Sequence, residues 1–314
     1  MNEILFLLFA FITVFLSIKL SYYVDYLSKH SNVSGAFLAG IVLAGVTSLP
    51  EFVTCFSAMF VDNSMLAVGD ILGSNIFNVF MICVFDLFFI KKYMFSNMKS
   101  NHNLIYILLL INYLVLYLFV GNFSSFNLSL IGIPTIFIFG TYLYYLFRIS
   151  SDKSEVVKIN DSNCNHVVIK LIVTAVLMVF SSVTLTIIVN NLAKLHPYFS
   201  SSFLGAIFLG ITTSLPEVIT CYALINMDSF DLALDDIIGS NFFNLLILAI
   251  ADLSFTGSIY SHADSGAMIL IIIGFMFTLL SFISANKHMD KCYGTLSFVI
   301  IITYLGYWII NFLG

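Results

Sequence analysis

The sequence has very little charge. Only 9% of its 314 residues are Asp, Glu, Lys or Arg, whereas 60% are hydrophobic, and the mean hydropathy is +1.04. A soluble domain of this length needs far more charged surface, so we expect the chain to lie in a lipid bilayer. The longest polar stretch, residues 149–167, is too short to form a domain in water. The small net charge of −5 predicts no nucleic-acid partner.

Patterns typical of disulfide, zinc and hydrolase sites are also missing. The five cysteines form no CxxC pair, which argues against a disulfide framework or a zinc site. There is no HExxH string and no nucleophile–base pair, so an intramembrane hydrolase is the least favoured function, and we expect neither an enzyme nor a cofactor. The start, MNEILFLL, lacks basic residues and a small-residue cleavage site, and is expected to be a retained membrane helix.

Long apolar runs are abundant. A membrane helix needs roughly 20 apolar residues. Division of the chain at its polar residues predicts an all-α polytopic membrane protein with ten transmembrane helices. The predicted spans are 3–27, 33–61, 65–90, 103–120, 127–148, 166–194, 202–226, 231–257, 266–285 and 294–313.

The basic residues predict an orientation, because lysine and arginine concentrate on the cytoplasmic side. Most of them fall in alternate loops or at helix ends on one side, and only Lys194 is left for the other side. The chain is therefore expected to be a multi-pass protein of the cell membrane, with residues 149–165 in the cytoplasm and both termini outside.

The chain matches itself without a gap when it is shifted by 166 residues. Thr-Ser-Leu-Pro-Glu occurs at 47–51 and 213–217, and Gly-Ser-Asn at 73–75 and 239–241. Further matching pairs are Thr54 with Thr220, Asp70 with Asp236, Asn78 with Asn244, and Asp86 with Asp252.

This match predicts the duplication of a five-helix unit. The first repeat covers 1–148 with its motif at 39–79, and the second covers 166–314 with its motif at 205–245; the loop 149–165 joins them. Because five is odd, the second copy must enter the membrane inverted. Inverted repeats with interrupted helices are typical of secondary transporters, whose site lies between the repeats near the bilayer midplane.

Two prolines predict interruptions. Pro50 and Pro216 lie inside apolar spans, and proline has no N–H to bond the carbonyl four residues earlier. The carbonyls of Val46 and Thr212 are therefore expected to be free and to require protein, water or an ion as partner.

A glutamate follows each proline. Of the four glutamates, Glu51 and Glu217 lie inside predicted spans near the bilayer centre, and no Lys or Arg is placed to neutralise them. A structural hydrogen bond is the alternative interpretation of one such residue, but for an equivalent pair a bound cation is the simplest counter-charge. The nearby side chains that share their helix faces offer only oxygen ligands, which suits Ca²⁺ or Na⁺. The predicted metal ligands are Glu51 and Glu217, helped by Thr47, Ser48, Ser74, Asn78, Thr213, Ser214, Ser240 and Asn244.

Other repeated residues give weaker indications. Asp70 and Asp236 either line vestibules on opposite sides of the site or are solvated carboxylates at helix ends. Gly73 and Gly239 are expected to allow close approach of helices. Asp86 and Asp252 are expected to cap helix ends or to pack between helices.

At these strings the chain resembles the calcium/cation antiporter superfamily, and specifically its sodium/calcium exchanger family of prokaryotic type. The motifs of that family are GTSLPE-like strings followed by G-S-N-x-x-N. They stand here as VTSLPE with GSNIFN and as TTSLPE with GSNFFN. The resemblance extends over nearly the whole chain through the ten-span inverted architecture.

The resemblance implies an antiporter that exchanges Na⁺ for Ca²⁺ by alternating access, with both ions bound as substrates and a monomer sufficient. It makes Glu51 and Glu217 the principal Ca²⁺ ligands, adds backbone carbonyls at Ala44 and Gly210, and makes the first and sixth helices a sliding gate. Asn244 stands where potassium-dependent relatives are acidic, which argues against K⁺ transport.

Two alternatives stay open at this point. The first is a proton-coupled Ca²⁺ exchanger, although neither motif carries the acidic string that the proton-coupled branch resembles. The second is a cation channel, which could use the same oxygen ligands. Channels usually arrange their ligands by oligomeric symmetry rather than by inverted repeats, so this alternative is less favoured.

Overall fold

The protein is helical throughout the part described by the structure, a computed structural model. That part covers residues 2–60, 63–88, 100–121, 132–150, 163–193, 206, 210–254, 259–286 and 293–313. The predicted all-α class is confirmed there, since these residues contain no strand. Only helices and closed barrels satisfy every backbone polar group in lipid, and the apolar composition makes helices the expected solution.

Most of the helices are long and apolar. They are α1 (Asn2–His30), α5 (Ser64–Phe88), α6 (Ser100–Gly121), α7 (Ile133–Ser150), α8 (Cys164–Ala193), α12 (Phe230–Ser254), α13 (Ser265–Asn286) and α14 (Tyr293–Leu313). In the described part of the chain, seven helical segments are long and apolar enough to cross a membrane. Three shorter apolar helices lie at Ile133–Ile149, Leu215–Asn226 and Gly294–Ile310.

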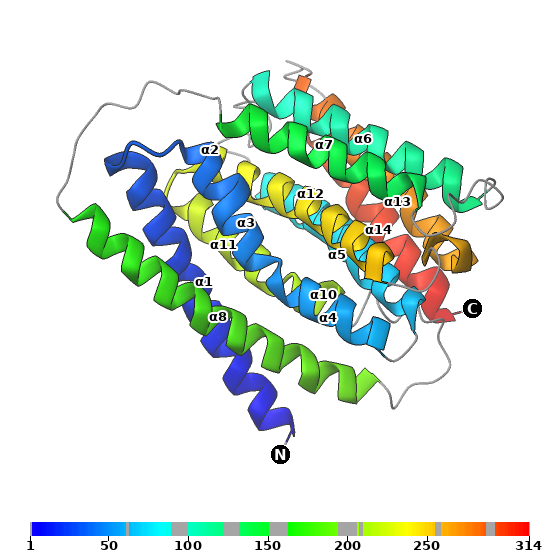
Figure 1. The fold of residues 1–314 in the computed structure, drawn as a ribbon, viewed down its shortest axis with the longest axis horizontal. Coiled ribbons are helices and arrows are strands. Elements are labelled where there is room, and N and C mark those ends of the chain that lie inside the picture. The colour runs from blue at the N-terminus through cyan, green and yellow to red at the C-terminus, as the bar shows by residue number, and fades with distance from the viewer. Residues whose placement is uncertain are drawn as a thin grey trace.

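One helical segment in each half is interrupted at a serine. In the first half, α2 (Gly35–Phe37), the π-helix η1 (Leu38–Leu43) and α3 (Ala44–Thr47) lead to Ser48, after which α4 (Leu49–Phe60) begins. In the second half, α10 (Gly210–Thr213) leads to Ser214, after which α11 (Leu215–Asn226) begins (Figure 1). The two serines have nearly the same backbone angles, φ −88° and ψ 7° for Ser48 and φ −78° and ψ 5° for Ser214.

Each proline follows its break, as predicted. Pro50 and Pro216 are the second residues of α4 and α11, where the helix needs no N–H donor from them. The backbone N–H of Ser48 bonds to the carbonyl of Ala44 at 3.1 Å, one turn before the break. The free carbonyls expected at Val46 and Thr212 stay a prediction.

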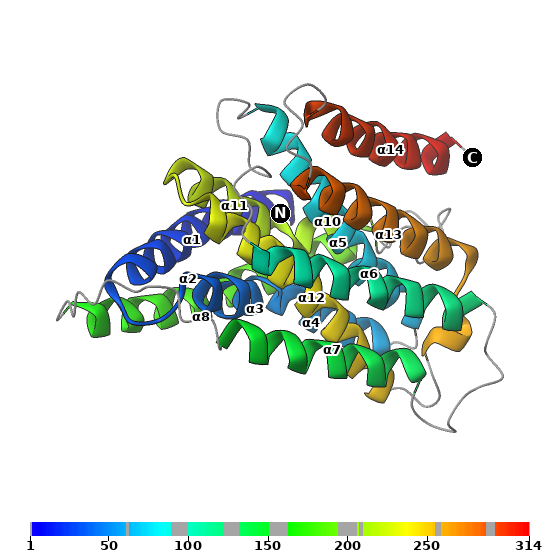
Figure 2. The same ribbon diagram turned by 90° about the horizontal axis from the view of Figure 1, so that it is seen from above.

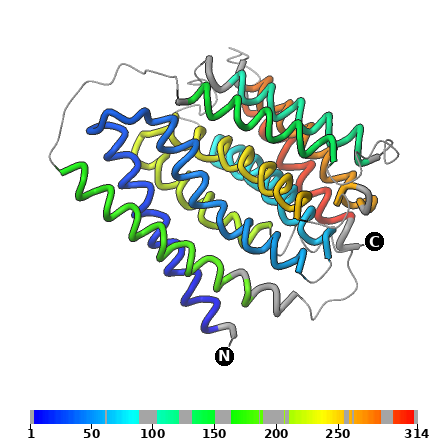
Figure 3. The backbone as a smooth tube through the Cα atoms, in the orientation of Figure 1, coloured from blue at the N-terminus to red at the C-terminus, as the bar shows by residue number. Residues whose placement is uncertain are grey.

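The helices α5 and α12 form the centre of the molecule. They contact each other, and the interrupted segments pack against both of them, as the ribbon and tube views show (Figures 1 and 3). The pair α1 and α8 lies on one side of this centre, and α6, α7, α13 and α14 lie on the other; Figure 2 shows α14 at the outer edge. The two halves are therefore interleaved at the centre.

The polarity of the molecule is opposite to that of a soluble protein. Large apolar side chains such as Phe11 and Phe15 of α1, and Val176 and Phe180 of α8, are exposed. The carboxylates, amides and hydroxyls of α4, α5, α11 and α12 are buried. This distribution fits a hydrocarbon solvent and concentrates the polar groups between the halves.

Two glycines allow the halves to touch closely, which confirms their predicted role. A Cβ atom on Gly239 would lie 2.2 Å from the carbonyl oxygen of Gly40, and a Cβ atom on Gly73 would lie 2.3 Å from the Cα atom of Ala206. Gly40 and Ala206 are themselves equivalent in the 166-residue repeat. Each half therefore presses its central helix against the same position of the other half.

The second pair of repeated aspartates fixes helix ends, as expected. Asp252 accepts hydrogen bonds from the backbone N–H groups of Gly132 (3.0 Å) and Ile259 (2.9 Å), and Ile259 begins the short 3₁₀ helix η4 (Ile259–His262). Asp86 accepts a hydrogen bond of 2.8 Å from Ser297 of α14. Both carboxylates serve packing between helices.

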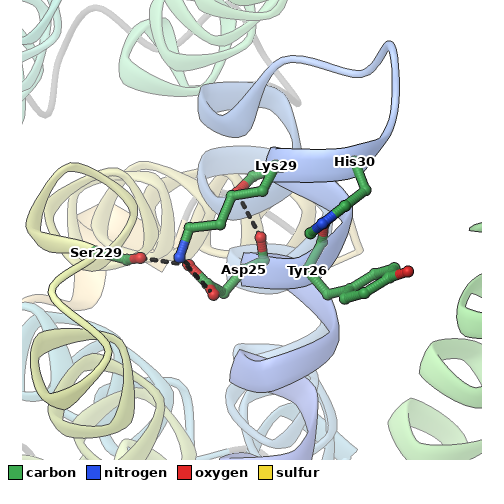
Figure 4. Close-up of polar contacts among 6 residues, drawn as sticks. Asp25, Tyr26, Lys29, His30 and Ser229 are labelled. Atoms are coloured by element: carbon green, nitrogen blue, oxygen red, sulfur yellow. Dashed lines mark hydrogen bonds and ion pairs between the residues drawn. The ribbon is translucent and has the colours of Figure 1, made fainter. Parts of the chain in front are cut away.

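The end of α1 is attached to the turn between α11 and α12. Asp25 accepts a short hydrogen bond from Ser229, and Lys29 of the next turn of α1 pairs with the same carboxylate at 2.8 Å (Figure 4). Closer to the middle of α1, the hydroxyls of Thr13 and Ser181 lie 2.9 Å apart and join α1 to α8. The long helix is thus held by a few polar contacts along an apolar surface.

Candidate cation-binding site

The two intramembrane glutamates lie at the beginnings of helices. Glu51 is in the first turn of α4 and Glu217 in the first turn of α11, and both are fully buried. The break at the preceding serine creates these helix N-termini inside the protein. A helix N-terminus carries a partial positive charge, which helps to stabilise a carboxylate. The Ser-Leu-Pro-Glu sequence thus folds locally so that a charged group is tolerated in the core.

Each glutamate is held by the serine of the other half. The hydroxyl of Ser48 donates to Oε1 of Glu217 at 3.0 Å, and the hydroxyl of Ser214 donates to Oε1 of Glu51 at 3.2 Å. The two bonds join equivalent positions in exchanged roles. The glutamates, which are 166 residues apart in sequence, therefore belong to one cluster.

A second ring of hydroxyls has the same reciprocity. Oγ1 of Thr47 lies 3.4 Å from Oγ of Ser240, and Oγ of Ser74 lies 3.3 Å from Oγ1 of Thr213. Each contact joins the interrupted segment of one half to the central helix of the other half. Hydroxyl oxygens have two lone pairs and one proton, so they can accept a cation while they donate a hydrogen bond.

Backbone carbonyls lie beside these hydroxyls. Thr47 donates to the carbonyl of Ala44 at 3.2 Å, and Ser74 donates to the carbonyl of Gly210 at 3.2 Å. A Cβ atom on Gly210 would lie 3.0 Å from the backbone nitrogen of Ser74, so only a glycine allows this approach without a shift. The resemblance to the exchanger family implies that the backbone carbonyls of Ala44 and Gly210 are cation ligands.

Four amides join the central helices, and two of them were not expected in the site. Asn75 donates to the carbonyl of Asn241 at 3.1 Å, and Asn241 donates to the carbonyl of Asn75 at 3.3 Å. Asn78 donates to the side-chain oxygen of Asn241, and Asn244 to that of Asn75, both at 3.0 Å. Asn75 and Asn241 carried a signal in the sequence, since they are identical in the two copies of Gly-Ser-Asn.

The cluster contains buried oxygen atoms that have no hydrogen-bond partner among the residues the structure describes. There are six such atoms on repeated acidic and amide side chains, three from each half, and they form equivalent pairs. They are Oε2 of Glu51 and Glu217, Oδ2 of Asp70 with Oδ1 of Asp236, and Oδ1 of Asn78 and Asn244. Buried polar atoms without a partner are rare and costly, so each of these oxygens requires water, a proton or a cation.

The two aspartates are buried next to the glutamates rather than open to solvent in this structure. Asp70 and Asp236 are both fully buried. Asp70 accepts a hydrogen bond of 3.3 Å from Thr213, whereas Asp236 accepts one of 2.6 Å from Thr220. Their predicted vestibule role stays a prediction, and burial now places two further carboxylates beside the cluster.

All fourteen predicted site residues are buried. Hydrogen bonds join them into three groups, which together we call the cluster: Ala44, Thr47, Ser48, Ser240, Glu217 and, through Thr220, Asp236; Glu51, Asp70, Ser74, Gly210, Thr213 and Ser214; and Asn78 with Asn244 through Asn75 and Asn241. The donors that face each other are oxygens of carboxylates, amides, hydroxyls and carbonyls. Within the described residues, no group of three or more His, Cys, Asp and Glu side chains is arranged around a metal position. The chemistry is therefore that of a mixed oxygen site, which is typical of hard cations and not of zinc.

Comparison with known proteins identifies a family. The family model described as sodium/calcium exchanger protein matches residues 3–148 and 166–313, with a gap over the intervening segment. Among curated relatives, the uncharacterized membrane protein MJ0091 of Methanocaldococcus jannaschii is 24% identical over 272 residues, which is 86% of this chain and 85% of the relative. The inner membrane protein YrbG of Escherichia coli is 26% identical over 248 residues, 74% of each chain.

Solved structures share the fold. The sodium/calcium exchanger from Methanococcus jannaschii superposes with a TM-score of 0.70 at 18% identity and covers 96% of this chain and 98% of its own. A structure of the same exchanger soaked with 2.5 mM Na⁺ and 0.1 mM Ca²⁺ gives a TM-score of 0.68 at 19% identity and covers 97% of each chain. The family match confirms the predicted membership of the sodium/calcium exchanger family, the solved structures show the same fold, and both curated relatives are membrane proteins.

Proposed function

Because this chain belongs to the sodium/calcium exchanger family, we propose that it is a secondary antiporter that exchanges Na⁺ for Ca²⁺ across the cell membrane. The observation that carries the proposal is the set of six partnerless buried oxygens on the two repeats. Ca²⁺ takes six to eight oxygen ligands, and Na⁺ also prefers oxygen. Two buried glutamates with two buried aspartates nearby attract cations, and a bound cation supplies the counter-charge that the site favours.

The ligand set follows from the equivalent positions. Glu51 and Glu217 supply the charge that binds Ca²⁺, and the surrounding neutral oxygens complete the coordination. The proposed contributors are Thr47, Ser48, Ser74, Asn78, Thr213, Ser214, Ser240 and Asn244, with the carbonyls of Ala44 and Gly210. The reciprocal contacts of the serines support one site shared by the two repeats.

The proposed topology has ten transmembrane helices in two inverted repeats, residues 1–148 and 166–314, with both termini outside. The seven long spans and three shorter apolar helices of the described part support that number. The equal geometry of the breaks at Ser48 and Ser214 supports the repeat relation. Alternating access then exposes the shared site to one side at a time.

A transport assay tests this function. Purified protein in liposomes is expected to take up ⁴⁵Ca²⁺ when a Na⁺ gradient is imposed, with no pH gradient and without K⁺. Uptake that requires a pH gradient and ignores Na⁺ would contradict the proposal and favour proton coupling. Ca²⁺ flux that needs no counter-ion and does not saturate would indicate a channel. The matched control is Thr278→Val in α13, which removes a buried hydroxyl that bonds the carbonyl of Gly274 outside the cluster.

A further inference from the structure

Most side-chain hydrogen bonds that join repeated polar residues of the cluster occur in equivalent pairs, but those of the two aspartates do not. Asp70 accepts its bond from Thr213, a cluster residue of the other half, at 3.3 Å. Asp236, its counterpart, accepts its bond from Thr220 of its own half at 2.6 Å. The serine–glutamate, threonine–serine and asparagine–asparagine contacts are all reciprocal, whereas the contacts of the two aspartates with their threonines are not.

The counterpart threonines are in different situations as well. Thr54, the equivalent of Thr220, is buried and its hydroxyl has no partner within the described structure. Thr47, the equivalent of Thr213, makes the same two contacts to the carbonyl of Ala44 and to Ser240 that Thr213 makes to Gly210 and Ser74, but it has no hydrogen bond to an aspartate in the described structure. One aspartate oxygen on each side is also without a partner. A threonine hydroxyl and aspartate oxygens are therefore available for the arrangement in which the two halves have exchanged their aspartate–threonine contacts.

The sequence allows each half to adopt either arrangement. Thr54 precedes Asp70 by sixteen residues, and Thr220 precedes Asp236 by the same number. The helices that carry them, α4 with α5 and α11 with α12, pack against each other in both halves. When inverted repeats alternate between sides, each half takes up the conformation that the other half had.

We propose that Asp70 and Asp236 exchange threonine partners when the transporter changes sides. In the present state Asp70 binds Thr213 and Asp236 binds Thr220. In the opposite state Asp236 binds Thr47, and Asp70 withdraws to Thr54. The inference rests on the proposed antiport and names two positioning residues for it.

The exchange has a chemical consequence for the cluster. A threonine hydroxyl has one proton to donate. When Thr213 donates to the Asp70 carboxylate, its lone pairs face away from that bond and can accept a cation beside Ser74. Thr47, which donates to the Ala44 carbonyl, lacks this charged acceptor in the same state. Each aspartate thus prepares one cluster threonine as a ligand in one state only.

Matched substitutions test the exchange. Thr220→Val removes a bond of the present state, whereas Thr54→Val removes a bond of the opposite state. The apparent Ca²⁺ affinity at one face of the membrane scales with the fraction of protein that is open to that face. We therefore expect the ratio of the affinities at the two faces to rise in one valine variant and to fall in the other, by roughly fivefold in each. Thr54→Ser and Thr220→Ser keep the hydroxyl and are expected to restore the wild-type ratio, and Thr278→Val is expected to leave it unchanged.

The measurement compares Ca²⁺ dependence of flux in vesicles of defined orientation. A shift in the same direction for both valine variants, or no shift, would overturn the proposal. A second arm needs no transport, so it separates this inference from the proposed function. Structures of the wild type and of Thr220→Val in lipid nanodiscs are expected to differ, with Asp236 at Thr47 and Asp70 at Thr54 in the variant. A variant that keeps the wild-type partners, or changes sides with Asp70 still at Thr213, would disprove the exchange.

Discussion

At the scale of single residues, the glutamates have the clearest role. Each is buried at a helix N-terminus, has one oxygen bonded to a serine of the other half, and has one oxygen without a partner in the described structure. The bonded oxygen fixes the carboxylate, and the other oxygen is available to a cation. The same side chain thereby connects the halves and supplies the charge.

Replacement of either glutamate by the neutral amide separates these two tasks. Glu51→Gln or Glu217→Gln keeps a bond acceptor for Ser214 or Ser48 but removes the charge, so we expect Ca²⁺ exchange to be lost while the protein still folds. Na⁺-driven ⁴⁵Ca²⁺ uptake measures the loss, and the elution volume and thermal unfolding in detergent measure the fold. Near-normal uptake by either variant would refute its assignment as a principal Ca²⁺ ligand.

The sequence predicted these residues because charge inside an apolar repeat is unusual and was found twice. It predicted the glutamates, the hydroxyls of both motifs and the amides Asn78 and Asn244, all of which the structure brings together. It did not predict that Asn75 and Asn241 join the central helices, because an amide between two long apolar helices bonds wherever the helix rotation places it. The periodicity of apolar residues does not fix the rotation of a helix precisely enough to predict which hydrogen bonds its amides make.

At the scale of helices, the two breaks and the close crossings define the site. Ser48 and Ser214 end their helices with nearly equal angles, and the prolines that follow were sufficient to predict both positions. The π-helical turn Leu38–Leu43, which contains the Gly40 that lies against Gly239, was not predicted. The periodicity of apolar residues does not distinguish such a turn from an ordinary helical turn.

The crossing of α12 with the first half predicts a strong effect of a single methyl group. In Gly239→Ala the new Cβ atom would meet the backbone of Gly40 at 2.2 Å, so the helices must separate. We expect a loss of at least about 2 kcal/mol in stability, seen as a lower melting temperature in detergent. Gly140→Ala on α7, where nothing lies within 4 Å of the new atom, is the control and should keep or raise that temperature. Equal melting temperatures for the two variants would contradict the close approach.

The end of α1 predicts a second effect at this scale. Asp25→Asn weakens the acceptor for Ser229, and we expect faster amide hydrogen exchange over the last turns of α1 by roughly three- to tenfold. Lys29→Gln removes only a half-exposed partner of the same carboxylate and is expected to change exchange rates little. If Lys29→Gln had the larger effect, the ion pair and not the bond to the turn would hold this end of α1.

At the scale of the whole molecule, the apolar exterior and polar centre make the bilayer part of the mechanism. The predicted helical class is confirmed in the described residues, and the family is confirmed by matches to both halves. The predicted orientation and the gate role of α1 and α8 stay predictions. Orientation depends on basic residues in loops, many of which lie outside the described residues, and a gate requires a second conformation.

Four buried carboxylates in one cluster predict competition between protons and Ca²⁺. A proton occupies an oxygen that the cation needs, so the apparent Ca²⁺ affinity is expected to fall as the pH is lowered and to recover as it is raised. Initial rates of ⁴⁵Ca²⁺ uptake at several Ca²⁺ concentrations, with equal pH on both sides and a constant Na⁺ gradient, measure the effect. An affinity that rises on acidification would mean that the protonated side chains do not bind the cation.

The reciprocal bonds have a consequence beyond transport. Asn75 meets its own counterpart, Asn241, and each serine meets the counterpart of its neighbouring glutamate. In a pair of separate subunits this pattern would be called an isologous interface, the self-complementary kind found in two-fold dimers. On the proposed repeat architecture, one five-helix half would encode both surfaces of the joint that it forms, and the chain would correspond to two such halves linked covalently.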